Sequence, residues 1–179
     1  MEETCSECDF NESTTPPSSV ATALVQLGGA IGATIHSIPA DAIRRRPAPE
    51  VWSPLEYLGH LRESMAFHRW LIELALAEHN PNVPMVNPDE SVADANYNDA
   101  ATTDLIAQFD RRTQRLSALL VTLDDDSARR PLTLGARRIT VALIARSAWH
   151  ECHHHHGDIR RSLASTSALQ RHGTADPDQ

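Results

Sequence analysis

The chain has 179 residues, 41% hydrophobic and 22% charged, which suits one domain with its own core. Its net charge of −8 argues against a nucleic-acid partner, because phosphate contacts need a basic face. No apolar run approaches the ~20 residues that span a bilayer, and the acidic N-terminus lacks the features of a signal peptide, so we expect a cytoplasmic protein without a membrane partner.

Residues 1–17 have the composition of a polar N-terminal tail and contain Cys5-Ser6-Glu7-Cys8. This C-x-x-C is by itself half of a zinc site, a redox pair or a chance occurrence. The third cysteine, Cys152, lies four residues before His156, and this pair could complete a structural zinc site with Cys5 and Cys8. The sequence does not decide among these alternatives.

Four later segments have the apolar periodicity of amphipathic helices, and aromatic residues are only 4% of the chain. Ser53-Pro54-Leu55-Glu56 is typical of a capping box with proline at the first helical position. The predicted fold is an all-α four-helix bundle over residues 18–165 with long inter-helix connections, followed by a disordered C-terminal tail, 166–179. The helices are expected at residues 18–38, 54–79, 102–123 and 140–163.

Two connections are informative. Residues 81–100 form a predicted long loop, which is either a lid or wall of a site or a crossing at the end of the bundle. Residues 131–139 are expected to be a short extended or turn segment centred on Gly135.

The last predicted helix carries a run of histidines. His150 and His154 are four residues apart, so their side chains share one helix face and can bind one metal ion. His60 in the second helix, which follows Gly59, is the candidate third ligand, although alone it could equally be a histidine bonded to a neighbour. The remaining members of the run, His153, His155 and His156, are interpreted as an exposed polar edge.

Residues 150–154 also read H-E-x-x-H, the motif of zinc proteases. The extended form of that motif would place a histidine at position 160, where this chain has Arg160. No glutamate follows Glu151, so a downstream glutamate ligand is excluded, and the motif does not indicate a protease.

Three motifs occur in order that together resemble the DinB/YfiT-like superfamily: WSPLEYLGHL at residues 52–61, LTLGARR at 132–138 and HECHHHHGDI at 150–159. The resemblance covers about residues 18–165. It implies a four-helix bundle whose three histidines, here His60, His150 and His154, hold a divalent metal. Members with assigned activities include transferases and isomerases that use bacillithiol or mycothiol. In the mycothiol-dependent maleylpyruvate isomerase the position matching His150 is a glutamate, so that substrate is not implied here.

The expected cofactor is one divalent metal, with zinc favoured over nickel or iron, together with a low-molecular-weight thiol. Three functions remain open: a metal-dependent thiol transferase acting on a small electrophile, a metal-dependent hydrolase, and a metal-stabilised binding or stress protein without chemistry. The expected partners are a small-molecule substrate and a second copy of the chain in a homodimer.

Asp158 lies one turn beyond His154 and could orient that ligand. Glu151 could be a base near the metal or a surface carboxylate, and no catalytic residue is identified.

Overall fold

Six α-helices, a short 3-10 helix and three strands make up the part of the chain that our computed structural model describes, residues 4–6, 8 and 17–172. The long helices are α1 (Pro17–His36), α2 (Pro54–Ala77), α4 (Thr102–Val121) and α6 (Val141–His172). The short elements are β1 (Asn82–Val83), α3 (Pro88–Ala95), η1 (Tyr97–Asp99), α5 (Asp125–Ala128), β2 (Pro131–Leu134) and β3 (Arg137–Thr140).

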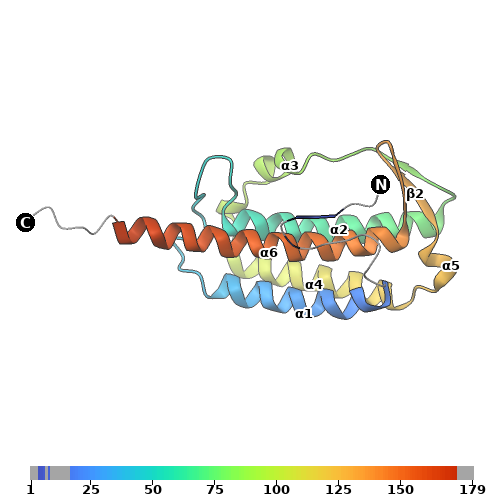
Figure 1. The fold of residues 1–179 in the computed structure, drawn as a ribbon, viewed down its shortest axis with the longest axis horizontal. Helices are drawn as coiled ribbons and strands as arrows, with labels where there is room; N and C mark the ends of the chain where they lie inside the picture. The colour runs from blue at the N-terminus through green and yellow to red at the C-terminus, as the bar shows by residue number, and fades with distance from the viewer. Residues whose placement is uncertain (1–3, 7, 9–16, 173–179) are drawn as a thin grey trace, which may run out of the picture.

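The four long helices lie side by side as a bundle (Figure 1). Both α4 and α6 pack against α1 and against α2, so that α1 and α2 are diagonally opposite. The predicted all-α four-helix bundle is therefore confirmed. Because α2 and α6 are neighbours, their facing side chains can meet, as bundle sites require.

Helix α1 illustrates how sequence periodicity becomes a core. Val20, Leu24, Ile31 and Ile35 form one stripe and are buried, each worth roughly 1.5–3 kcal/mol relative to an exposed position. Its window Ser19–His36 has a mean hydropathy of 1.2 and could cross a membrane by length and composition alone. The buried stripe instead gives α1 the pattern of a core helix in a bundle.

The start of α2 is fixed by the predicted capping box. Ser53 Oγ accepts a hydrogen bond from the Glu56 amide, and the Ser53 amide donates to Glu56 Oε2 at 2.8 Å. The Glu56 carboxylate also accepts three hydrogen bonds from the Arg46 guanidinium, at 2.8–3.1 Å. The partners of Glu56 are thus Ser53 and Arg46. His60, one turn later in α2, contacts the carboxylate of Glu151 instead.

The connection between α2 and α4 contains regular secondary structure, whereas the sequence predicted a long loop there. It contains β1, α3 and η1, and β1 pairs in parallel with β2. Strands β2 and β3 form an antiparallel hairpin, with Leu132 opposite Ile139. Gly135 turns this hairpin with a φ of +59°, which confirms the turn predicted around it.

Helix α6 begins at the predicted cap and extends further than predicted. Thr140 Oγ1 accepts a hydrogen bond from the Leu143 amide. The helix continues to His172, whereas the sequence led us to expect a tail from residue 166. The reason is local: no glycine or proline occurs between Gly157 and Gly173, and the intervening alanines and leucines favour helix. The rest of that predicted tail, residues 173–179, lies outside the described residues, as does most of the predicted tail 1–17.

Candidate metal centre

Three half-buried side chains from α2 and α6 converge between these two helices. His60 Nε2 lies 2.9 Å from Glu151 Oε2, and His155 Nε2 lies 3.5 Å from the same oxygen. All three donor atoms lie within 4.8 Å of one another. Two imidazoles and one carboxylate form a donor set that binds catalytic zinc and also suits iron(II). The residues present therefore fit a divalent metal.

Asp158 contacts the edge of the His155 ring that faces away from Glu151. Its Oδ2 lies 2.7 Å from Nδ1 of His155, the ring nitrogen that does not face Glu151. Its other oxygen accepts a hydrogen bond from Arg161. A carboxylate on the second nitrogen of a ligating histidine fixes the ring's tautomer and orientation.

The ionisation of the group follows from these contacts. Burial alone would raise the pKa of Glu151, but hydrogen bonds from His155 and His60 hold it well below its ordinary value. Burial alone would lower the pKa of His155, but hydrogen bonds to Asp158 and Glu151 have the larger effect and raise that pKa to about 9. At neutral pH the cluster therefore pairs an ionised Glu151 carboxylate with a protonated His155 ring, and a metal cation would take the place of that proton.

Aromatic rings pack around the two histidines. The Trp52 ring lies 5.1 Å from that of His60, and the Tyr57 ring lies 5.2 Å from that of His155. Burial and the nearby Asp158 charge raise the pKa of Tyr57 to about 12, so its hydroxyl stays protonated at neutral pH. These rings restrict the access of water to one side of the group.

A cavity of about 840 Å³ opens beside the three ligands, and His60 and Glu151 are part of its wall. The connection after α2 forms much of the opposite side, which is the wall role foreseen for residues 81–100. Its apolar lining includes side chains from α2, from that connection and from β2: Phe67, Trp70, Met85, Val86, Tyr97 and Leu134. Polar lining comes from Glu63, Ser64, His68, Ser91 and Asp94.

The structure divides the three histidines predicted as ligands between two groups. His60 faces Glu151 and His155, whereas His150 and His154 lie with Cys5 and Cys8. Asp158 Oδ2 lies 3.5 Å from Nε2 of His154, the ring that it was expected to orient, but its shorter contact is with His155. The prediction of His60, His150 and His154 as one ligand set is thus not the grouping that the described donor atoms form.

The proposed partners of Cys5 and Cys8 also change. Cys152 is fully buried, with its Sγ 3.8 Å from Met65 Sδ, and His156 hydrogen-bonds Thr34 on α1. Neither side chain belongs to the group of donor atoms with the two N-terminal cysteines, so the structure does not bring together the four residues of that alternative.

Two residues of the centre were missed by sequence reasoning. His155 was assigned to an exposed edge, and Glu151 was considered as a base near the metal or a surface carboxylate, but not as a ligand. The available signal was the buried stripe of α6, since Ala148, Cys152 and Ile159 are buried. Positions 151 and 155 continue that stripe at helical spacing.

Comparison with known proteins identifies a family and a similar solved structure. Residues 23–159 match the model of the DinB superfamily. No curated protein matches the chain in sequence. Among solved structures, YfiT from Bacillus subtilis, described as a probable metal-dependent hydrolase with an unusual four-helix bundle topology, is similar with a TM-score of 0.76. The identity is 18%, over 84% of this chain and 87% of that one, which shows a shared fold.

Proposed function

The chain belongs to the DinB superfamily, and on that premise we propose that it is a divalent-metal-dependent enzyme that transfers a low-molecular-weight thiol to a small electrophile. The observation that supports this most is the convergence of His60, Glu151 and His155 at the wall of a large cavity. Small-molecule sites combine such a cavity with a few convergent polar groups.

His60, Glu151 and His155 would hold the metal, and we propose zinc, which donor sets of this kind bind in catalytic sites. Three protein ligands leave a coordination position for another molecule, which distinguishes catalytic from structural sites. When bound, the cation supplies a Lewis acid that lowers the pKa of a neighbouring thiol or water. Asp158 keeps the His155 ring in place for this role.

The cavity is large for a single ligand, which is consistent with a thiol and an electrophile that bind side by side. Its volume of about 840 Å³ is near the upper end of the usual range for ligand sites. We infer that the hydroxyl and amide groups of a mycothiol-like thiol contact Ser64, Ser91 and Asp94, and that the electrophile packs against Phe67 and Trp70. A cytoplasmic location, which we also propose, would keep such a thiol reduced.

The reaction forms one bond between carbon and sulfur. The thiol loses its proton, the sulfur attacks the electrophilic carbon, and the leaving group departs with its bonding electron pair. His68 is suited to accept the proton. Its Nδ1 lies 2.8 Å from the Ser64 carbonyl, which can only accept, so Nε2 of the neutral ring remains an acceptor. Burial lowers the pKa of His68 and favours this neutral form.

Hydrolysis of a small molecule is the second candidate. It is favoured by the fold neighbour YfiT, which is described as a probable metal-dependent hydrolase. The same metal ligands would serve, with water in place of the thiol. Unlike the transferase, a hydrolase requires no thiol co-substrate, and this difference can be measured.

The test is to incubate zinc-loaded protein with mycothiol and an aryl halide and to measure thioether formation. We expect a rate above the uncatalysed reaction that disappears in Glu151→Gln. His153→Gln is the matched control, because His153 is exposed and stacks on Trp149. It should retain the full rate.

Two outcomes would overturn the proposal. One is a rate no higher than the uncatalysed reaction with mycothiol, bacillithiol and glutathione. The other is thiol-independent turnover of an ester or amide panel that is lost in Glu151→Gln, which would establish the hydrolase. If both assays are blank while metal removal still lowers the melting temperature, the protein is a metal-stabilised binding protein.

A further inference from the structure

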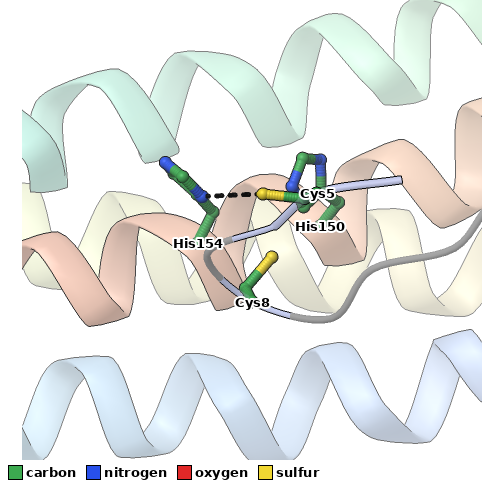
Figure 2. A group of neighbouring side chains, drawn as sticks. All are labelled: Cys5, Cys8, His150 and His154. Carbon is green, nitrogen blue, oxygen red and sulfur yellow. Dashed lines mark hydrogen bonds between the residues drawn. The ribbon is translucent and has the colours of Figure 1, made fainter. Parts of the chain in front are cut away.

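The N-terminal segment, of which the structure describes residues 4–6 and 8, carries two cysteines that lie beside two histidines on the outer side of α6. Figure 2 shows the segment crossing in front of α6, with the side chains of Cys5 and Cys8 directed toward His150 and His154. We propose that these four residues form a second, structural zinc site that fastens the N-terminal segment to the bundle.

The geometry fits one ion. One donor atom from each of the four side chains lies within 4.8 Å of all the others. Cys5 Sγ lies 3.5 Å from Nδ1 of His154. In a tetrahedral site with usual zinc–sulfur and zinc–nitrogen bonds, the sulfur and nitrogen atoms are about 3.6 Å apart. The contact has this length before any metal is considered.

The spacing along the chain fits the same chemistry. The two cysteines are separated by two residues and the two histidines by three, which are the spacings of sites with two thiolates and two imidazoles. On α6, residues four apart project from one face, and the rings of His150 and His154 are 5.5 Å apart. Two thiolates also balance the charge of Zn²⁺, so the completed site is neutral.

This site differs in kind from the centre formed by His60, Glu151 and His155. Its four ligands all come from the protein, which leaves no position for a substrate and marks a structural role. It contains sulfur donors, whereas the first centre contains none. All four residues are half-buried, so the ion would be shielded by the segment and the helix.

Metal binding explains why this segment lies on the bundle. The described residues 4–6 and 8 form no helix or named strand of their own, and ordering such a chain costs conformational entropy. The free energy of zinc binding to four ligands can offset that cost. A disulfide between Cys5 and Cys8 would not fasten the segment, because it would involve no residue of α6.

The decisive measurement uses Co²⁺ as the probe, with the full-length protein in a thiol-free buffer that contains a phosphine reductant. We expect absorption from thiolate-to-cobalt charge transfer, which requires cysteine ligands. Cys5→Ser and Cys8→Ser should each abolish or strongly weaken this band. In zinc-loaded protein the same variants should lower bound zinc from about two ions per chain to about one.

Matched controls separate this site from the first centre and from other ligands. Glu151→Gln should keep the charge-transfer band even if it abolishes activity, so the two proposals can fail independently. Cys152→Ala should also keep the band, because Cys152 is buried against Met65. Amide hydrogen exchange of residues 4–8 should slow when zinc is added to wild type but not to Cys5→Ser.

Three results would overturn the inference. The first is a wild-type protein without the charge-transfer band. The second is Cys5→Ser and Cys8→Ser proteins with unchanged zinc content. The third is loss of the band in Cys152→Ala with a folded bundle, which would identify a different ligand set.

Discussion

Nδ1 of His155 lies 2.7 Å from Oδ2 of Asp158, and Nε2 of the same ring faces Glu151 at 3.5 Å. The two contacts use opposite sides of one imidazole. Asp158 therefore determines which nitrogen of His155 is available for a metal. The same Oδ2 lies 3.5 Å from Nε2 of His154, so one carboxylate adjoins a residue of each proposed metal site.

Removal of this carboxylate should weaken metal binding without unfolding the protein. We expect Asp158→Ala to lower the affinity of the first centre by about 10- to 100-fold, because the His155 ring loses its orienting partner. Competition with a chromophoric chelator measures the change. Asp126→Ala is the control, since its side chain is 92% exposed and pairs with a surface arginine, Arg129. Equal affinities in the two variants would contradict the role of Asp158.

The bundle could be predicted from the sequence because the capping, turn and hydrophobic-periodicity signals all indicated the same helices. The cap at Ser53, the turn at Gly135 and the apolar stripe of α1 are local signals, and the structure contains all three. The site was harder to predict. Within residues 150–156, three overlapping pairs have the same four-residue spacing: His150 with His154, Glu151 with His155, and Cys152 with His156.

The choice among these pairs depends on the rotation of α6, because adjacent residues differ by about 100° around a helix. Cys152 faces Met65 in the core, which turns Glu151 and His155 toward His60 and turns His150 and His154 toward the N-terminal segment. The pattern of residue types alone favoured histidine pairs and missed the glutamate. Contact between Cys5 and His154 is also beyond sequence patterns, since nothing local links positions so far apart.

His68 gives a second prediction, which concerns catalysis alone. Asparagine at this position can still donate to the Ser64 carbonyl but lacks the second ring nitrogen. We expect His68→Asn to lower kcat by about 10²- to 10⁴-fold while zinc content stays unchanged. His79→Asn, at an exposed histidine beyond the end of α2, should have wild-type kinetics. A kcat within error of wild type would exclude His68 as the proton acceptor.

Two glycines should respond in opposite directions to the same substitution. A Cβ at Gly59 would overlap the buried ring of Tyr97, so Gly59→Ala should destabilise the protein by roughly 1–3 kcal/mol. Gly29 is exposed within α1, and, apart from the adjoining backbone of α1, no described atom lies within 4 Å of a Cβ built there. Gly29→Ala should therefore stabilise by roughly 0.5–1 kcal/mol. Urea unfolding measures both, and a destabilised Gly29→Ala would contradict the packing described for α1.

The ion pair between Glu56 and Arg46 predicts a pH dependence of stability. Burial alone would raise the pKa of Glu56, but hydrogen bonds from Arg46 and Ser53 lower it below its ordinary value. A carboxyl group whose pKa is lower in the folded state stabilises that state above its unfolded pKa of about 4.3. This contribution is lost as the pH falls through the folded-state pKa.

The variant Glu56→Gln isolates this effect, because glutamine can retain the capping box but cannot ionise. At pH 7 its free energy of unfolding should be lower than that of wild type by roughly 1–3 kcal/mol, since the hydrogen bonds to Arg46 lose their charge. The difference between the two proteins should shrink as the pH is lowered below about 4.3. Urea unfolding at a series of pH values measures it. A difference that stays constant down to pH values at which wild type unfolds would show that the capping geometry, and not the charge of Glu56, stabilises the start of α2.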